Sequence, residues 1–594
     1  MKYIRNFSII AHIDHGKSTL ADRFIEICNK LEKEKLNLIL DSMELEKEKG
    51  ITIKSQCITL NYEFEGNIYT LNLIDTPGHM DFTYEVSRAI SACEGAILLI
   101  DASQGIEAQT IANYNKAIAK NLKIITVLNK IDLIQADPNL IENEIRTILN
   151  IDTNEIPRIS AKNGTGVKDL IETIIKTIPH PSGNLNNKLQ ALIIDSWFNN
   201  YLGIIALIKI ENGILNKNDK IIIMSTNKIH KVIELGIFNL KKEYKDKLNT
   251  GEVGFIVTGS KDTENFPIGD TITLQANPST LPLTSFQKIK PNIFAGIFTI
   301  EPDNFEFLKV ALAKLRLNDS SLEYTIQNSN VFGFGFRCGF LGPLHMEIIT
   351  ERLEREYNLK TITTPPSVMF KITLKNGTIK YIDNPNQLPE LNLISNILEP
   401  IADVNIVTPE KYLGSVIKLC ISNRGVQNNI MYTSNQISVK YKIPINEIIF
   451  SFCNKLKTIS QGFASMEYSF CEFKKADLIK LSILVNKKKI DALEFIIHRN
   501  DSYKKGKDII EILKEIIPKH MFDVTIQAAI ENKIIARAVI KALRKNVTAK
   551  CYGGDITRKK KLLKKQSLGK KRMKNTGNVE IPQKAFLAIL DAGK

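Results

Sequence analysis

The chain has 594 residues and a formal net charge of +16 at pH 7. One hydrophobic core cannot serve a chain of this length, so we expect about three to five domains. A hydrophobic content of 43% and a charged content of 24% are ordinary for a globular protein. The longest apolar runs, such as residues 95–100, are too short to cross a bilayer, and no signal peptide is recognisable. We therefore expect a cytoplasmic protein, bound at most to a membrane surface.

The first part of the chain, residues 1–183, alternates short β-rich runs with helical patterns. Amphipathic helical stretches such as residues 106–119 and 141–149 separate the runs. This alternation predicts a doubly wound α/β domain with a parallel sheet and ligands at the carboxyl ends of its strands. The predicted strands are residues 7–10, 68–74, 96–100, 123–128 and 156–159.

The sequence Ala-His-Ile-Asp-His-Gly-Lys-Ser-Thr follows the first of these runs and leads into a helical pattern. Backbone N–H groups in such a loop, together with the helix dipole, attract a phosphate. We expect Lys17 to reach the β- and γ-phosphates and the Ser18 hydroxyl to ligate Mg²⁺. Ala11 stands where the usual pattern has glycine, which weakens the motif taken by itself. The predicted nucleotide-binding residues of the loop are Asp14, His15, Gly16, Lys17, Ser18 and Thr19.

A second motif, Asp-Thr-Pro-Gly-His at residues 75–79, follows the second run. A carboxylate that ends a buried strand, here Asp75, can hold Mg²⁺ through water, and Gly78 lets its N–H approach a γ-phosphate closely. Thr52 lies in an irregular, charged stretch and can supply a second hydroxyl ligand when a triphosphate is bound. The predicted metal ligands are therefore Ser18, Thr52 and Asp75.

Two further motifs point to a guanine base. The Asp132 carboxylate can accept two hydrogen bonds from guanine, whereas adenine would leave it unpaired. Losing two charged hydrogen bonds corresponds to roughly 10²- to 10⁴-fold discrimination. The turn at residues 160–162 can pack against the base, so we expect GTP or GDP as the ligand. The residues concerned are Asn129, Lys130, Ile131, Asp132, Ser160, Ala161 and Lys162.

Residues 184–285 and the two regions after them show other patterns. A linker rich in Pro and Gly precedes short strands with regular turns, which predict a small antiparallel β-barrel over residues 184–285. Residues 290–375 and 395–485 each follow the order βαββαβ, which predicts two ferredoxin-like α+β domains. We expect the last strand of the first unit at residues 368–372 and that of the second at residues 481–485.

The final region, residues 486–594, reads as a basic α+β domain with a strongly charged tail. Residues 533–574 contain sixteen Lys and Arg residues against one acid, Asp555. Such a segment is either a solvated tail or a polyanion-binding face, and the apolar closing run 581–587 favours a tail tied back to its domain. Without a base-reading pattern we expect recognition of RNA shape and backbone, not of DNA. The predicted RNA-binding residues are Lys550, Tyr552, Arg558, Lys559, Lys560, Lys561, Lys564, Lys565, Lys570, Lys571, Arg572 and Lys574.

Five nucleotide motifs in this order resemble a GTPase, and the forms at residues 11–19 and 75–79 resemble those of the translation factors, which share the Ala11 departure. The runs at residues 333–356, 459–465 and 550–574 resemble the LepA (elongation factor 4) family. Elongation factor G has a similar set of domains but carries an additional elongated domain between its α+β units. Here only residues 375–400 lie between those units, too few for a domain.

This resemblance implies a monomeric, ribosome-dependent GTPase whose partners are ribosomal RNA and tRNA. By analogy, His79 would orient the attacking water beside Lys17 and Gly78, and Ile13 and Ile51 would form an apolar gate that keeps His79 away until ribosomal RNA draws it in. The activity proposed for the family is one-codon back-translocation of tRNAs as a fidelity or stress factor. A role in initiation or in small-subunit biogenesis is the alternative, and peripheral association with the cytoplasmic face of the membrane is a further expectation.

Overall fold

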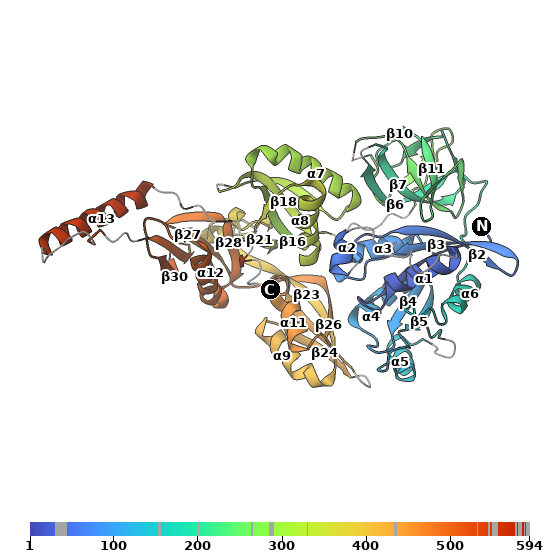
Figure 1. Cartoon of the computed structure of the whole chain (residues 1–594), viewed down its shortest axis with the longest axis horizontal. Helices are drawn as coiled ribbons and strands as arrows, with labels where there is room; N and C mark the ends of the chain where they lie inside the picture. Colours follow the sequence, from blue (N-terminus) through green and yellow to red (C-terminus); the bar gives the residue numbers. More distant parts are fainter. Residues whose placement is uncertain are drawn as a thin grey trace.

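The computed structural model presents the domains side by side, with the N-terminal domain and the barrel at one end and helix α13 at the other (Figure 1). It describes residues 1–29, 44–50, 52–151, 156–199, 201–262, 265–283, 290–329, 331–432, 436–531, 533–543, 547–548 and 556–576, with positions 579, 582, 585, 586, 588 and 589. No helix among these residues is long and apolar enough to span a membrane.

The N-terminal domain is a doubly wound sheet in the order β2-β3-β1-β4-β5, as the alternating pattern predicts. Strands β1, β3, β4 and β5 are parallel, and apolar helix faces cover both sides of the sheet. The strands are β1 (Ile4–Ala11), β2 (Cys57–Phe64), β3 (Asn67–Asp75), β4 (Gly95–Asp101) and β5 (Lys123–Asn129). The helices are α1 (Lys17–Asn29), α2 (Glu44–Lys49), α3 (Thr83–Ser91), α4 (Ala108–Ala119), α5 (Pro138–Glu144) and α6 (Val167–Thr177).

Two details of this sheet differ from the expectation. Strand β2 was not predicted; it pairs antiparallel with β3 at the sheet edge through the tight turn at Glu65 and Gly66, both with positive φ. The run at residues 156–159 forms only an isolated bridge, between Arg158 and Leu128. Both errors concern the sheet margins, where the hydrophobic signal is weakest because one side of the strand is exposed.

The second domain is antiparallel, with the strand order β10-β9-β15-β6-β7-β14-β11-β12 and a small ribbon of β8 with β13. Side chains from every strand of this sheet except the two edge strands, β10 and β12, and from both strands of the ribbon enter one apolar core, as expected for a barrel. The strands are β6 (Gln190–Asn199), β7 (Gly203–Asn212), β8 (Ile214–Asn216), β9 (Lys220–Ile223), β10 (Lys228–Lys231), β11 (Glu234–Phe238), β12 (Lys242–Lys245), β13 (Lys247–Asn249), β14 (Val253–Val257) and β15 (Thr271–Leu274).

The first α+β unit has the strand order β17-β18-β16-β19, with the short β20 also paired to β16. Helices α7 and α8 supply the apolar residues that cover its sheet. Its elements are β16 (Ile293–Thr299), α7 (Phe305–Asn318), β17 (Glu323–Ser329), β18 (Gly333–Phe340), α8 (Pro343–Tyr357), β19 (Thr361–Thr363) and β20 (Ser367–Val368).

The second α+β unit has the order β22-β21-β23-β25-β24, with β26 paired along β23. Its elements are β21 (Phe370–Leu374), β22 (Ile379–Ile382), β23 (Ile394–Thr408), α9 (Leu413–Ser422), β24 (Val426–Tyr432), β25 (Ile437–Pro444), α10 (Ile445–Glu447), α11 (Cys453–Ile459) and β26 (Ser465–Lys475).

Two predicted strands belong to a different sheet from the one expected. Residues 368–372 do not form one closing strand: β20 closes the first unit, while β21 begins a hairpin in the second. Residues 481–485 lie in β27 (Leu478–Val485), which belongs to the C-terminal sheet, and β26 closes the second unit instead. A period-two pattern identifies a strand but not its partner, because pairing is decided by packing over long distances.

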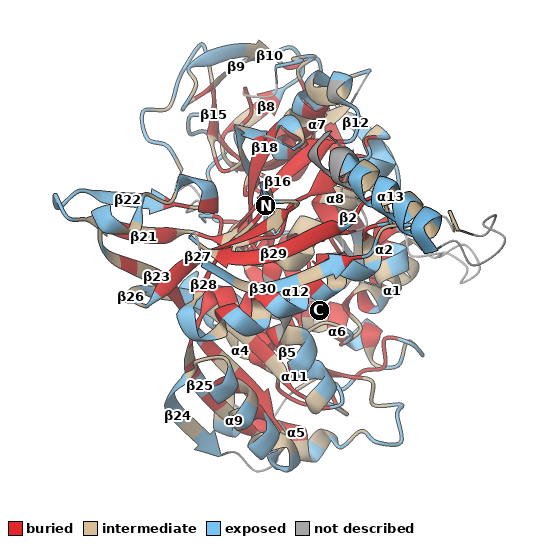
Figure 2. Ribbon diagram, turned by 90° about the vertical axis from the view of Figure 1, so that its left-hand side faces the viewer, coloured by how far each residue is buried: buried red, intermediate tan, exposed pale blue. Residues whose placement is uncertain are grey.

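The C-terminal domain has the strand order β28-β27-β29-β30 and packs helix α12 on its core. Its closing residues return to this core: Phe586 is fully buried and contacts Phe332 edge-on, which confirms that the tail is tied back. Figure 2 shows most of the α13 residues whose burial is described as exposed, in contrast. The elements after β27 are β28 (Lys488–His498), α12 (Ser502–Ile516), β29 (Val524–Ile530), β30 (Lys533–Ile540) and α13 (Ile556–Thr576).

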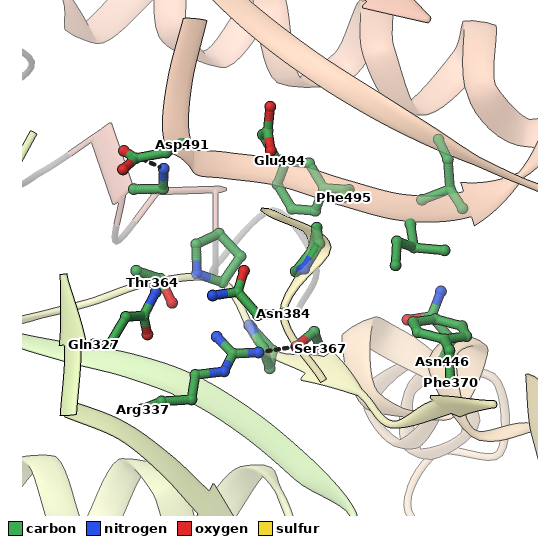
Figure 3. Close-up of a pocket in the computed structure, with 16 residues that line it drawn as sticks. Gln327, Arg337, Thr364, Ser367, Phe370, Asn384, Asn446, Asp491, Glu494 and Phe495 are labelled. Atoms are coloured by element: carbon green, nitrogen blue, oxygen red, sulfur yellow. Dashed lines mark hydrogen bonds between the residues drawn. The ribbon is translucent and has the colours of Figure 1, made fainter. Parts of the chain in front are cut away.

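The two α+β units and the C-terminal domain meet around a cavity of about 30 Å³, drawn in Figure 3. Arg337 of β18 reaches across it to Ser367 and to the carboxylate and carbonyl oxygens of Asp383. Because its charged group is already hydrogen-bonded and the space holds little more than one or two waters, we interpret this junction as structural.

Candidate nucleotide-binding site

The phosphate-binding loop lies between β1 and α1, at the carboxyl end of the sheet. Asp14 and Gly16 have φ angles of 63° and 91°, in the left-handed region. A Cβ atom on Gly16 would lie 2.5 Å from the Nδ2 atom of Asn129. Only glycine therefore fits at this position, and the loop curls tightly into the first turn of α1.

Asn129 connects the phosphate-binding loop to the turn at residues 160–162. Its Nδ2 donates a hydrogen bond to the carbonyl oxygen of His15 at 2.9 Å, and its Oδ1 accepts one from the N–H of Ala161 at 2.9 Å. Arg23 of α1 donates to the carbonyl oxygens of Ala161 and Lys162. Three motifs that lie far apart in the sequence thus form one connected rim.

Lys130 and Asp132 continue this rim. Lys130 Nζ lies 2.7 Å from Oδ2 of Asp101, a fully buried carboxylate at the end of β4. Burial alone would raise the pKa of Asp101, but hydrogen bonds from Lys130 and Ser103 lower it below its usual value. The Asp132 side chain is exposed at the rim, open to a base. Asp101 was not among the predicted site residues, although it ends a buried parallel strand just as Asp75 does.

Two of the predicted metal ligands, Asp75 and Thr52, each lie beside a residue of the phosphate-binding loop. Lys17 Nζ lies 3.8 Å from Asp75 Oδ1, and both side chains are buried. Ser18 Oγ lies 3.4 Å from Oγ1 of Thr52, which comes from a separate segment. Two hydroxyls and a carboxylate are hard oxygen donors of the kind that Mg²⁺ prefers. The residues present therefore fit Mg²⁺ beside a bound triphosphate.

Two histidines stand in the phosphate-binding loop. His15 is fully buried, and burial lowers its pKa to about 4, so the ring is neutral at pH 7. His12 Nε2 lies 2.6 Å from Oε2 of Glu107, the residue before α4. The next residue, Ala108, donates its N–H to Ser465 Oγ of β26. The loop is thereby linked through α4 to the second α+β unit, a connection that no local sequence pattern indicates.

His79 lies beside α4 and β26. Its Nδ1 accepts a hydrogen bond from the N–H of Asp81 at 3.1 Å. Its ring lines a small pocket together with Lys116 of α4 and Glu467 of β26, whose charged atoms are 3.6 Å apart. Burial lowers the pKa of His79, and the nearby positive charge of Lys457 acts in the same direction.

The predicted apolar gate can be described only in part. A Cβ atom on Gly78 would lie 3.6 Å from Ile13, so this glycine packs directly against the isoleucine. Ile51, the other predicted gate residue, lies outside the described residues. Ile13 therefore lies against Gly78, the residue before His79, and its role in a gate stays a prediction.

The segments on both sides of the nucleotide site contact helix α8. The buried Asp81 carboxylate accepts hydrogen bonds from the N–H groups of Leu344 at 2.8 Å and His345 at 3.3 Å, which begin this helix. Lys49 of α2 pairs with Glu347 at 2.8 Å and Glu351 at 3.1 Å. If nucleotide exchange moved the segment around Asp81 or helix α2, these contacts would therefore move α8 or break.

The predicted RNA-binding residues differ in how far the structure describes them. Helix α13 contains many Lys and Arg residues and no acid. Lys550 and Tyr552 lie outside the described residues, as do the side chains of Lys571, Arg572 and Lys574. Lys559 and Lys570 are half-buried. The exposed cations of the helix are Arg558, Lys560, Lys561, Lys564 and Lys565.

Comparisons with known proteins identify three regions of the chain. Residues 2–180 match the family described as elongation factor Tu GTP binding domain, and residues 396–484 match elongation factor G C-terminus. Residues 485–591 match GTP-binding protein LepA C-terminus. The fold is similar to the crystal structure of a protein from Thermus thermophilus, with a TM-score of 0.60 at 15% identity over 80% of this chain and 98% of that chain.

An elongation factor Tu-type domain marks a GTPase that binds GTP and GDP. The elongation factor G-type unit places it among the ribosome-dependent translation factors, and the LepA C-terminus distinguishes it within that group. The three domains together show that the chain belongs to the elongation factor G-like translation GTPases of the LepA type.

Proposed function

We propose that this GTPase hydrolyses GTP by in-line attack of water on the γ-phosphate at the site between α1 and residues 52–79. The observation that carries this proposal is the approach of Ser18 Oγ to Thr52 Oγ1 at 3.4 Å. These hydroxyls would hold Mg²⁺, with Asp75 acting through water, and the ion would neutralise charge on the phosphates. Lys17 and the N–H of Gly78 would stabilise the charge that develops on the γ-phosphate.

His79 is the residue we propose to orient the attacking water. In the structure its ring lies against α4 and β26, and the preceding residue, Gly78, packs against Ile13. We expect His79→Ala to lower ribosome-stimulated hydrolysis by at least about 10²-fold, the usual contribution of a positioned acid–base group. GTP affinity should stay unchanged. Full ribosome-stimulated activity in the variant would refute the assignment.

On the ribosome we propose one-codon back-translocation of tRNAs, with helix α13 contacting ribosomal RNA and tRNA. Exposed cations without a base-reading pattern suit backbone recognition of structured RNA. Toeprinting of defined post-translocation ribosomes with this protein and GTP should show a one-codon backward shift. Absence of the shift, together with binding to precursor small subunits, would support biogenesis instead. The monomeric state and peripheral membrane association stay predictions.

A further inference from the structure

Part of the second α+β sheet presents aromatic rings and lysines on one face. Strands β22, β21, β23 and β26 lie next to one another, and residues paired across them share a face. One such row runs from Tyr381 through Lys371 and Leu398 to Lys475. We call the side chains Tyr381, Phe470, Phe473, Lys371 and Lys475 the aromatic–lysine face.

The three rings of this face are contiguous. The centroid of Phe473 lies 6.0 Å from that of Tyr381 and 5.2 Å from that of Phe470. The outer two rings are nonetheless 57% and 47% exposed. Further along the sheet, side chains from α9 and α11 cover the core, so those apolar positions are buried. The rings therefore form an open platform where the helical cover is missing.

The lysines on this face indicate the kind of ligand that would bind there. Lys475 is exposed and Lys371 is half-buried, and both lie on the same face as the rings. The neighbouring residue Glu472 lies opposite Ile401 in the strand register, so its side chain is on the other face of the sheet, where its carboxylate binds Lys442 at 2.8 Å. A ligand that brings flat aromatic groups and negative charge together fits these features, and an apolar protein surface would leave the lysines unmatched.

We propose that the aromatic–lysine face binds unpaired RNA nucleotides, with bases stacked on Tyr381 and Phe470 and phosphates held by Lys371 and Lys475. Bases inside a duplex stack on each other, so only a loop, bulge or single strand presents them to a protein. This contact is separate from α13, which contains no aromatic residue. The choice of RNA rests on the proposed ribosomal partner, but the binding test below does not need the ribosome.

The first test compares two probes with the full-length protein, a 12-nucleotide oligouridine and an abasic strand of equal length. At about 0.3 M salt, we expect a Tyr381→Ser/Phe470→Ser variant to bind oligouridine at least about tenfold more weakly. Its binding to the abasic strand should not change. Tyr432→Ser is the matched control, because Tyr432 is 70% exposed on β24 at the other edge of the sheet. Equal binding of oligouridine by the aromatic variant and the wild type would overturn the proposal.

Substitution of the two lysines should change RNA binding in a different way from substitution of the rings. Lys371→Gln/Lys475→Gln should weaken both probes alike and reduce the slope of log affinity against log salt by about 1.4, or about 0.7 for each contact. An unchanged slope would count against the phosphate contacts.

A third measurement needs no variant and so does not depend on folding. Ultraviolet crosslinking of the wild-type protein on ribosomes should join nucleotides to β22 and to β26. Crosslinks confined to α13 would refute the proposal while leaving the proposed GTPase function intact. Circular dichroism and a thermal unfolding curve matched to the wild type show that each variant has folded.

Discussion

The nucleotide site and helix α13 lie at opposite ends of the molecule and are built in opposite ways (Figure 1). At the nucleotide site Lys17, Asp75 and Asn129 are buried and held at fixed distances by their neighbours. On α13 the cations are mostly exposed along one helix. Buried geometry discriminates between ligands, because a wrong partner leaves a desolvated group unpaired, whereas exposed charge gives affinity without discrimination.

The two regions also differ in how they connect to the rest of the chain. Residues beside the nucleotide site contact α8 through Asp81 and Lys49, and α4 contacts β26 through Ala108. The segment that follows α13 is anchored in the C-terminal core through Phe586. Nucleotide binding can therefore affect the packing of both α+β units, whereas the segment after α13 packs in the C-terminal core.

The largest effect should come from the base-binding carboxylate. We expect Asp132→Ala to reduce the preference for GTP over ATP by roughly 10²- to 10⁴-fold, because two charged hydrogen bonds to guanine are lost. Competition binding with fluorescent nucleotides measures this ratio. Asp169→Ala on the exposed face of α6 is the control and should leave the ratio unchanged. If Asp132→Ala kept its full preference, discrimination would lie elsewhere in the site.

Substitutions in helix α13 should lower the affinity for the ribosome without changing which nucleotide the protein prefers. Neutralising four of its lysines should lower ribosome affinity by roughly 10²-fold near physiological salt and reduce the salt slope by about 3. The affinity of the variant for GTP should not change. The substitutions, each to Gln, are at Lys560, Lys561, Lys564 and Lys565.

The matched control for α13 removes the same charge from exposed lysines of the barrel and should affect ribosome binding much less. Deleting residues 533–594 is a weaker test, because it also removes β30 and the buried Phe586. Equal losses in the two charge variants would mean that α13 acts only through net charge. The control lysines, each changed to Gln, are Lys217, Lys220, Lys241 and Lys247.

The buried His15 makes the nucleotide site sensitive to acid. Burial lowers its folded pKa to about 4, against about 6.5 in an unfolded chain. The unfolded state then binds more protons between these values, so stability is lost as pH falls through this window. We expect His15 to account for about 2 kcal/mol of the loss in unfolding free energy between pH 7 and pH 5.

Urea unfolding of the N-terminal domain, followed within the full chain, tests this effect. His15→Ala should lower stability at pH 7 but show a correspondingly smaller loss on acidification. Identical pH dependence in the wild type and the variant would mean that another group titrates.

The smallest effect should be at the contact between Asp81 and α8. Asp81→Ala removes the acceptor for the N–H groups of Leu344 and His345, at a cost of about 1 kcal/mol. Hydrogen exchange of these amides should then be about fivefold faster. Asp81→Asn keeps an acceptor oxygen and should behave nearly as the wild type. Unchanged exchange in the alanine variant would show that the helix start is held by other contacts.

Much of the nucleotide site was predictable because its motifs are local. The residues that approach one phosphate lie in a loop between a strand and a helix, and parallel strands bring their carboxyl ends to one edge. The structure accordingly brings Ser18 to Thr52 and Asn129 to the phosphate-binding loop. Asp101 and Glu107 were missed, because their roles depend on side chains from other segments.

Strand partners were less predictable than strands. Residues 368–372 and 481–485 were predicted as the closing strands of the two α+β units, yet residues 370–372 and 481–485 pair in a different sheet from the one expected. Hydrophobic alternation reports that one face of a strand is buried, and it carries no information on which neighbour buries it.

The sequence by itself determined the guanine-nucleotide chemistry, the parallel α/β domain that carries it and the basic character of the C-terminal end, because each depends on residues close together in the chain. Only the tertiary structure decided that His79 lies against α4 and β26, that Asp81 caps α8 and that rings from β22 and β26 meet on one open face. Those contacts join residues far apart in the sequence, and their free energy is gained only when whole domains pack together.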